Sequence, residues 1–93
     1  MAEKKDDDIE ALCELMDSVI EDTSVPRNIR SKISDAKDKI LNEGEKKDIR
    51  ISTSIYILED ISNDVNMPTH TRTEIWQIIS ELEAIREKAK KAR

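Results

Sequence analysis

Apolar residues recur at intervals of three and four along most of the chain, which places them on one side of an α-helix with 3.6 residues per turn. Acidic residues precede the first of these stripes, where they favour the positive end of a helix dipole. The spacing predicts four helices, whose stripes are Ile9, Leu12, Cys13, Met16, Val19 and Ile20; Ile29, Ile33, Ala36 and Ile40; Ile51, Ile55, Leu58 and Ile61; and Ile75, Ile78, Ile79, Leu82, Ile85 and Ala89.

The third segment carries a second pattern, because "IRISTSIYI" also alternates apolar and polar residues as a strand does. A single strand among three helices would have no partner for its backbone groups. We therefore expect a helix here, with a strand as the alternative.

Two phrases of the sequence are nearly the same, "SVPRNIRSKI" and "NMPTHTRTEI", with Pro26 and Pro68 separated by 42 positions. Ser24 and Asn66 are favourable N-cap residues, and proline is tolerated in the first turn of a helix. Each phrase therefore predicts a helix, a tight turn and a second helix. The chain is expected to contain two αα-hairpins.

The acidic and basic residues around each turn also correspond. Asp22 and Asp64 stand where the first helix of each hairpin should end, and Arg30 and Arg72 stand about one turn into the second helix. We expect each aspartate to form an ion pair with its arginine across the turn. Between the hairpins, Gly44 suits a left-handed C-terminal position, and the linker "NEGEKKDIR" supplies no motif of its own.

A hairpin period of 42 residues lies within the range of HEAT and armadillo units, but such solenoids need at least three repeats. Two hairpins that face each other instead form an all-α four-helix bundle, which we take as the fold class, with an internal duplication. The expected organisation is a single domain, residues 1–93, with hairpins at about 6–43 and 47–91. Self-association through a remaining apolar face is the alternative to a closed bundle.

Over residues 9–87, the chain resembles an uncharacterised family of short archaeal proteins, family 0147. The resemblance rests on "DTSVPRNIR" and "LEDISNDVNMPTHTRTEIWQIISELEAIRE", with their D-x-x-x-P-x-x-x-R turns and the "IW" of the last helix. It implies a compact helical bundle and assigns no activity.

Charged residues form 40% of the 93-residue chain and the formal net charge is −5, which argues against non-specific binding to nucleic acid or anionic lipid over the whole surface. The first residues contain no apolar leader, and no apolar run approaches the ~20 residues that span a bilayer. We expect a cytoplasmic protein without a membrane partner.

Catalytic chemistry has few candidates, since His70, Cys13 and Gly44 are the only residues of their types. One histidine and one cysteine cannot build a metal cage or a triad with a spare base, and one glycine cannot form a phosphate loop. Cys13 lies on an apolar stripe and is expected to be structural. We predict no enzyme activity, catalytic residue, cofactor, metal or small-molecule substrate.

The two aromatic residues, Tyr56 and Trp76, are offset from their apolar stripes. Packing inside a wide core wall is the favoured arrangement, and an exposed contact patch is the alternative. The predicted function is a protein-interaction or self-association module with these residues as anchors. The alternative is a nucleic-acid or ribosome-associated factor that uses Arg27, Arg30, Arg72 and the basic tail Arg86, Lys88, Lys90, Lys91 and Arg93, although complementarity with the helix dipole also accounts for the tail.

Overall fold

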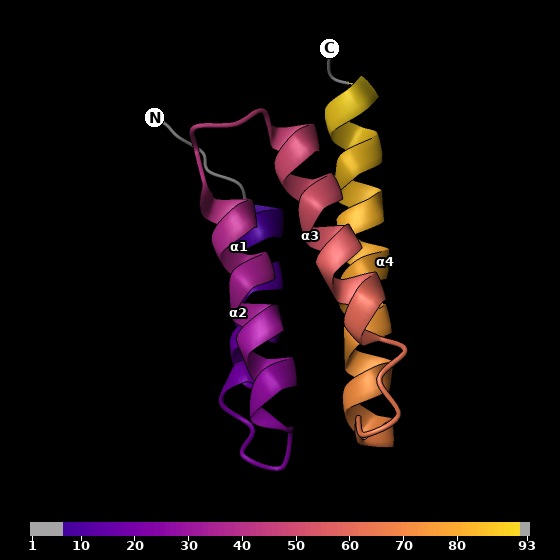
Figure 1. The fold of residues 1–93 in the computed structure, drawn as a ribbon. Helices are drawn as coiled ribbons and strands as arrows, with labels where there is room; N and C mark the ends of the chain where they lie inside the picture. Colours follow the sequence, from indigo (N-terminus) through magenta and orange to yellow (C-terminus); the bar gives the residue numbers. More distant parts are fainter. Residues whose placement is uncertain (1–6, 92–93) are drawn as a thin grey trace.

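The structure, a computed structural model, describes the backbone of residues 7–91 and the side chains of residues 8–88. Within that range the chain forms four helices and no strand, namely α1 (Asp7–Ile20), α2 (Arg27–Leu41), α3 (Lys47–Ile61) and α4 (Thr69–Lys91). The all-α prediction is confirmed, and the segment with two competing patterns is a helix. Figure 1 shows the four helices running up and down along one common direction.

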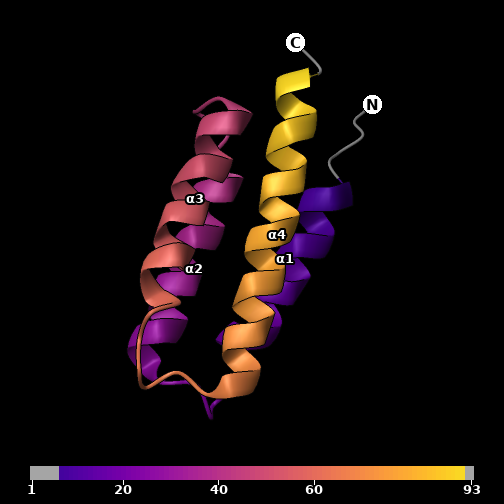
Figure 2. The ribbon, with the colours of Figure 1, turned by 90° about the vertical axis from the view of Figure 1, so that its right-hand side faces the viewer.

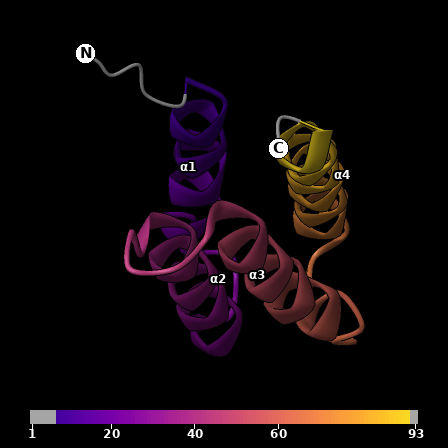
Figure 3. The ribbon, with the colours of Figure 1, turned by 90° about the horizontal axis from the view of Figure 1, so that it is seen from above.

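Each helix packs against its neighbours in sequence, and α1 also contacts α4, so that the four helices enclose one core. Figure 2 shows α3 and α4 side by side in front of α1 and α2, and Figure 3 shows the same arrangement along the helix axes. The fold is therefore a four-helix bundle of two layers.

The predicted stripes form the core, apart from Ala89, whose side chain lies outside the described residues. In α2 the buried residues are Ile29, Ile33, Ala36 and Ile40, and in α3 they include Ile51, Ile55, Leu58 and Ile61. Cys13 and Ile20 are only partly buried. The stripe analysis missed Val25 and Met67, which lie in the connectors, are 1% and 5% exposed and pack against the core.

The most extensive contact between two helices is that of α2 with α3, and small residues lie within it. Ala36 and Ser54 are both fully buried, and the Ser54 hydroxyl donates a 2.6 Å hydrogen bond to the Ala36 carbonyl oxygen. Short side chains allow the two backbones to approach, and the hydrogen bond satisfies the one polar side-chain atom that Ser54 brings into the core. The two hairpins are thus joined along α2 and α3.

The connectors before α2 and α4 have the same backbone hydrogen bonds. Asp22 Oδ1 accepts the N–H of Ser24 at 2.9 Å, and the N–H of Val25 donates to the Asp22 carbonyl at 3.0 Å. At the corresponding positions, Asp64 Oδ1 accepts the N–H of Asn66 at 2.8 Å, and Met67 donates to the Asp64 carbonyl at 3.3 Å. An aspartate that binds the backbone two residues ahead stabilises a tight turn in this way.

The connector between α2 and α3 is a third copy of this turn, contrary to the expectation that it carries no motif. Asn42 Oδ1 accepts the N–H of Gly44 at 3.0 Å, and the Asn42 carbonyl accepts the N–H of Glu45 at 3.3 Å. Lys46 takes the place of proline, with φ −63° and ψ 148° against −53° and 145° at Pro26. The repeated unit is one helix with its connector, and not only the hairpin.

An arginine follows each connector and donates to backbone carbonyls of the residues just before its own helix or at the end of the preceding helix. The predicted aspartate–arginine ion pairs are wrong for this reason, since the guanidinium groups bind backbone oxygens at short range instead. The hydrogen bonds to carbonyl oxygens join Arg30 Nε to Val25 at 3.0 Å, Arg50 Nη1 to Ile40 at 2.9 Å, Arg72 Nη1 to Ser62 at 3.0 Å and Arg72 Nη2 to Asp64 at 3.1 Å.

Two further local expectations are also wrong. Ser24 is not the N-cap residue of α2, and its hydroxyl donates to Asp22 Oδ1 at 2.7 Å instead. Pro26 occupies the N-cap position, without a side-chain cap. Gly44 does not adopt a left-handed conformation, and a Cβ atom there would lie 3.2 Å from Asn42 Oδ1. Whether the matching turns arose by internal duplication, and whether the domain spans the whole of residues 1–93, stay predictions.

Replacement of Lys46 by proline should stabilise the protein. Its φ of −63° already suits proline, and no backbone hydrogen bond from its N–H is present among the described residues. Lys46→Pro is expected to raise the free energy of unfolding by about 0.4–1 kcal/mol because it restricts the unfolded chain. Glu45→Pro is the matched control and should destabilise, since it removes the hydrogen bond to Asn42. Urea denaturation followed by circular dichroism measures both, and a destabilised Lys46→Pro would contradict the equivalence of the turns.

Loss of a turn arginine should cost more than loss of an exposed one. Arg72→Ala removes two hydrogen bonds to carbonyl oxygens and is expected to lower the free energy of unfolding by about 1–3 kcal/mol. Arg27→Ala, at an exposed position, should change it by no more than about 0.5 kcal/mol. Equal effects of the two substitutions in urea denaturation would show that the hydrogen bonds to the connector contribute little.

Candidate interaction surface

Tyr56 and Trp76 lie on the outside of the bundle, so the expectation that both rings pack in the core wall is wrong. Tyr56 is 77% exposed on α3, and Trp76 is 49% exposed on α4. The core has no room for them, because its stripes are already filled by isoleucine and leucine at every turn of both helices. Ile49 is also exposed on α3, seven positions before Tyr56.

A groove between α3 and α4 is lined in part by Tyr56. Its volume is about 350 Å³, and its lining residues are Ser52, Ile55, Tyr56, Glu59, Glu83 and Arg86. Arg86 Nη1 donates to the Ser52 hydroxyl at 3.3 Å, and nearer the connector Arg72 Nη1 donates to the Ser62 carbonyl at 3.0 Å. Trp76 lies between these two arginines along α4 and is not among the residues that line the groove.

Four exposed carboxylates share this side of the bundle. Glu59 and Asp60 follow Tyr56 by three and four positions, and Glu83 and Glu87 follow Trp76 by seven and eleven, spacings that place residues on one side of a helix. Their carboxylates form no ion pair or hydrogen bond with any residue that the structure describes. We call this surface the aromatic face: Tyr56, Glu59, Asp60, Trp76, Glu83 and Glu87, with the groove between them.

The aromatic face could be found from the sequence only in part. Glu59, Asp60 and Glu83 are visible there as residues of polar helix faces, and their spacing from the aromatic residues was the available signal. The pairing of α3 with α4 at the Ser52 and Arg86 level was not available, because helical periodicity within one segment says nothing about its register with another.

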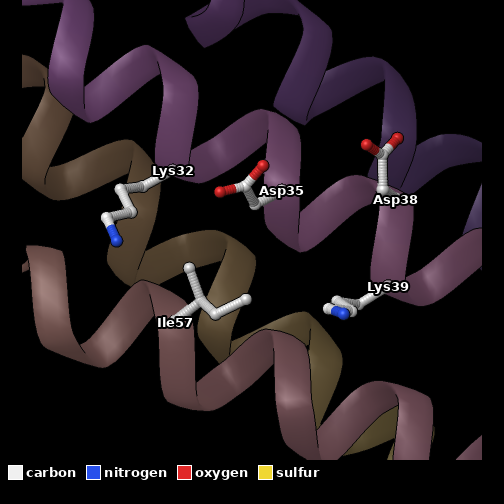
Figure 4. Close-up of a pocket in the computed structure, with 5 residues that line it drawn as sticks. All are labelled: Lys32, Asp35, Asp38, Lys39 and Ile57. Carbon is white, nitrogen blue, oxygen red and sulfur yellow. The ribbon is translucent and has the colours of Figure 1, made fainter.

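A second groove runs between α2 and α3 and differs in chemistry. Figure 4 shows Lys32, Asp35, Asp38 and Lys39 extending from α2, with Ile57 of α3 opposite them. Its volume is about 390 Å³. Charges of both signs line it and no aromatic residue does, so this groove has the character of an ordinary mixed-charge surface.

The candidate nucleic-acid contacts Arg30 and Arg72 are partly buried and are bound to the connectors. Arg86 is also partly buried, and Lys88 forms a 2.8 Å ion pair with Asp8 of α1. The side chains of Lys90, Lys91 and Arg93 lie outside the described residues. Arg27, another of the basic residues proposed for phosphate contacts, is exposed and forms no hydrogen bond or ion pair with a described residue.

The titratable groups take part in packing between helices. Burial raises the pKa of the Cys13 thiol, which disfavours the thiolate that a nucleophile needs. His70 Nε2 lies 3.3 Å from Asp22 Oδ2 and joins the first connector to the start of α4. Hydrogen bonds from Ser24, with a smaller contribution from His70, hold the pKa of Asp22 below its usual value.

Ion pairs connect α1 to both of its neighbours. The hydrogen bond from Lys88 lowers the pKa of Asp8, and the 2.6 Å hydrogen bond to Asp17 of α1 raises the pKa of Lys37 on α2. Among residues 8–88, no group of three or more histidine, cysteine, aspartate or glutamate side chains is arranged to hold a metal ion. None of the described helices is long and apolar enough to cross a bilayer.

Sequence comparison places this bundle among known proteins. The profile of the uncharacterised protein family UPF0147 matches residues 1–85. The chain belongs to this family. A UPF0147 protein of Methanocaldococcus jannaschii is 54% identical over 72 residues, which cover 77% of each chain, and one of Methanosarcina acetivorans is 51% identical over 72 residues, or 77% of this chain and 74% of the relative. The predicted archaeal family is confirmed.

Two crystal structures have the fold of this UPF0147 chain. A protein of unknown function is 45% identical, with a TM-score of 0.81 over 88% of this chain and 96% of the other. A UPF0147 protein from Thermoplasma acidophilum is 38% identical, with a TM-score of 0.79 over 83% of this chain and 91% of the other. The four-helix bundle is therefore shared with these relatives, and the family carries no assigned activity.

Asp22 should make the bundle sensitive to acid. Because its pKa is lowered by folding, its contribution to stability is present above the unfolded value of about 3.9 and is lost as the pH falls through the folded value. Asp22→Asn keeps a side-chain oxygen for the turn, as Asn42 does, and removes the charge. We expect the melting temperature of the wild type to exceed that of Asp22→Asn near neutral pH, and the difference to shrink below about pH 4.

The matched control is Asp35→Asn, which removes an exposed carboxylate that accepts no hydrogen bond from a described residue. Circular dichroism melts of the three proteins from about pH 7 to about pH 2.5 provide the comparison. A difference between wild type and Asp22→Asn that stays constant over this range would contradict the role of the Asp22 charge.

Proposed function

We propose that this UPF0147 protein is a non-enzymatic interaction module that binds another protein through the aromatic face. The observation that carries the proposal is the exposure of the two aromatic residues of the chain, Tyr56, which lines the α3–α4 groove, and Trp76 on α4. Aromatic residues with an apolar ring and a polar edge are enriched at the energetic centres of protein interfaces. Exposed apolar groups also have an unfavourable contact with water that binding would remove.

The location of these residues supports a role in binding over a role in folding. The bundle core is complete without either ring, and the backbone of the α3–α4 connector is held by Asp64 and Arg72. A side chain that contributes little to the fold and remains exposed is free to contact a partner. Leu41 and Val65, at 50% and 89% exposure, lie in or beside connectors, away from the aromatic groove lining, and provide a comparison.

The nucleic-acid alternative has less support from the charge distribution. Arg30 and Arg72 donate to backbone carbonyls, so their guanidinium groups are already engaged. The aromatic face carries exposed carboxylates, which repel a phosphate backbone. A cytoplasmic location agrees with this proposal and follows from the sequence expectation alone.

The test compares two double variants in affinity capture from an extract of the source organism, before and after nuclease treatment. Tyr56→Ser with Trp76→Ser should lose a nuclease-resistant protein partner that the wild type retains. Leu41→Ser with Val65→Ser removes exposed apolar side chains elsewhere and should keep it. Circular dichroism should show unchanged helix content in both, because all four residues are about half exposed or more.

Two outcomes would contradict the proposal. Retention of the same partner by the Tyr56 and Trp76 double variant would show that the aromatic face is not the contact. A retained complex that nuclease abolishes would favour nucleic-acid binding instead.

A further inference from the structure

We propose that the partner segment bound by the aromatic face is a basic amphipathic helix, with an apolar stripe flanked by lysine or arginine. This inference rests on the proposed function and adds the chemistry of the partner. Three features of the aromatic face carry it: the pair of helices that form the groove, the aromatic residues on both of these helices, and the sign of the charges on both sides of the groove.

The groove is lined by residues between Ser52 and Glu59 of α3 and by Glu83 and Arg86 of α4, two helices that lie side by side in Figure 2. A channel between two parallel helix axes accepts an amphipathic helix, whose apolar side chains enter it at intervals of three, four and seven residues. Ile55 lies at the floor of the groove, and Ser52 is a small residue on its wall. The floor is therefore apolar and shallow, which suits a helix better than a small molecule.

The two aromatic residues border the same groove from neighbouring helices. Tyr56 lines it, and Trp76 stands seven positions before Glu83 of the lining on α4. A spacing of seven residues places Trp76 and Glu83 on the same side of their helix. An apolar stripe of a partner helix that contacts Tyr56 in the groove can therefore extend to Trp76.

The charges select a basic partner. Glu59 and Asp60 stand on the α3 side of the groove and Glu83 and Glu87 on the α4 side, all exposed and without a cation among the described residues. Arg86, a cation in the groove lining, is partly buried and donates to Ser52. Lysine and arginine on the flanks of a docked helix would pair with these carboxylates, and a cation over Tyr56 or Trp76 would gain from the electron-rich ring face.

The same charges argue against the other occupants. A second copy of the chain that docked aromatic face to aromatic face would bring two sets of carboxylates together, and like charges across an interface are unfavourable. An acidic helix or a nucleic acid would meet the same repulsion. The mixed-charge groove between α2 and α3 lacks both the aromatic rings and the single sign of charge.

Trp76 provides the measurement, because it is the only tryptophan and is half exposed on the aromatic face. Its fluorescence is followed while the full chain is titrated with a synthetic 18-residue amphipathic helix of leucine and lysine, free of aromatic residues. A matched peptide has glutamate in place of each lysine. We expect a saturable blue shift with the lysine peptide, binding that weakens as salt is added, and no binding of the glutamate peptide.

Two charge variants locate the binding. Glu59→Gln with Glu83→Gln should weaken the affinity for the lysine peptide by about tenfold, because two partly exposed ion pairs are lost. Asp35→Asn with Asp38→Asn changes the net charge of the protein by the same amount in the α2–α3 groove and should leave the affinity unchanged. Both variants alter exposed side chains, and their helix content is checked by circular dichroism.

Equal weakening by the two double variants would show general attraction to an acidic protein and would overturn the proposal. Binding of the glutamate peptide, or absence of binding by the lysine peptide, would also overturn it. The proposed function would survive such a result if the captured partner were still lost on replacement of Tyr56 and Trp76, so the two proposals fail separately.

Discussion

The turn between consecutive helices depends on one pairing: a carboxylate or carboxamide that binds the backbone two residues ahead, and an arginine eight positions later that binds carbonyl oxygens around the same turn. Asp22 with Arg30, Asn42 with Arg50 and Asp64 with Arg72 all follow it. The last carbonyl groups of a helix have no partner within the helix. Arg50 and Arg72 satisfy two of them, at Ile40 in the last turn of α2 and at Ser62 directly after α3, whereas Arg30 binds Val25 within its connector. The bundle is a series of such steps.

These steps also explain where the molecule has its surface chemistry. The three turn arginines are bound to backbone oxygens and are therefore not available as a basic surface for a partner. The isoleucine-rich stripes fill the core, which contains neither aromatic residue, and Tyr56 and Trp76 lie outside it. An acidic, aromatic face on α3 and α4 follows from these two assignments. A face of this kind fits a binding role in a family that has no assigned activity.

Helical periodicity was informative wherever a stripe was continuous, and it located the four helices and most buried positions. It failed at the connectors for a specific reason. Asn42 and Lys46 perform the tasks of aspartate and proline with different side chains, so the third turn shares geometry with the others but few letters. The prediction of the arginine partners was also wrong. A nearby aspartate is visible in the sequence as a candidate partner, whereas a backbone carbonyl is present at every residue and gives no signal.

The sequence by itself determined the helices, their core stripes and the likeness of the first and last turns, because these depend on residues close together along the chain. Only the tertiary structure decided that Tyr56 and Trp76 are exposed, and that Glu59 and Glu83 border one groove. These outcomes depend on the register of α3 with α4 and on the close approach of α2 at Ala36 and Ser54. Such contacts join residues far apart in the chain, and periodicity within one helix carries no information about them.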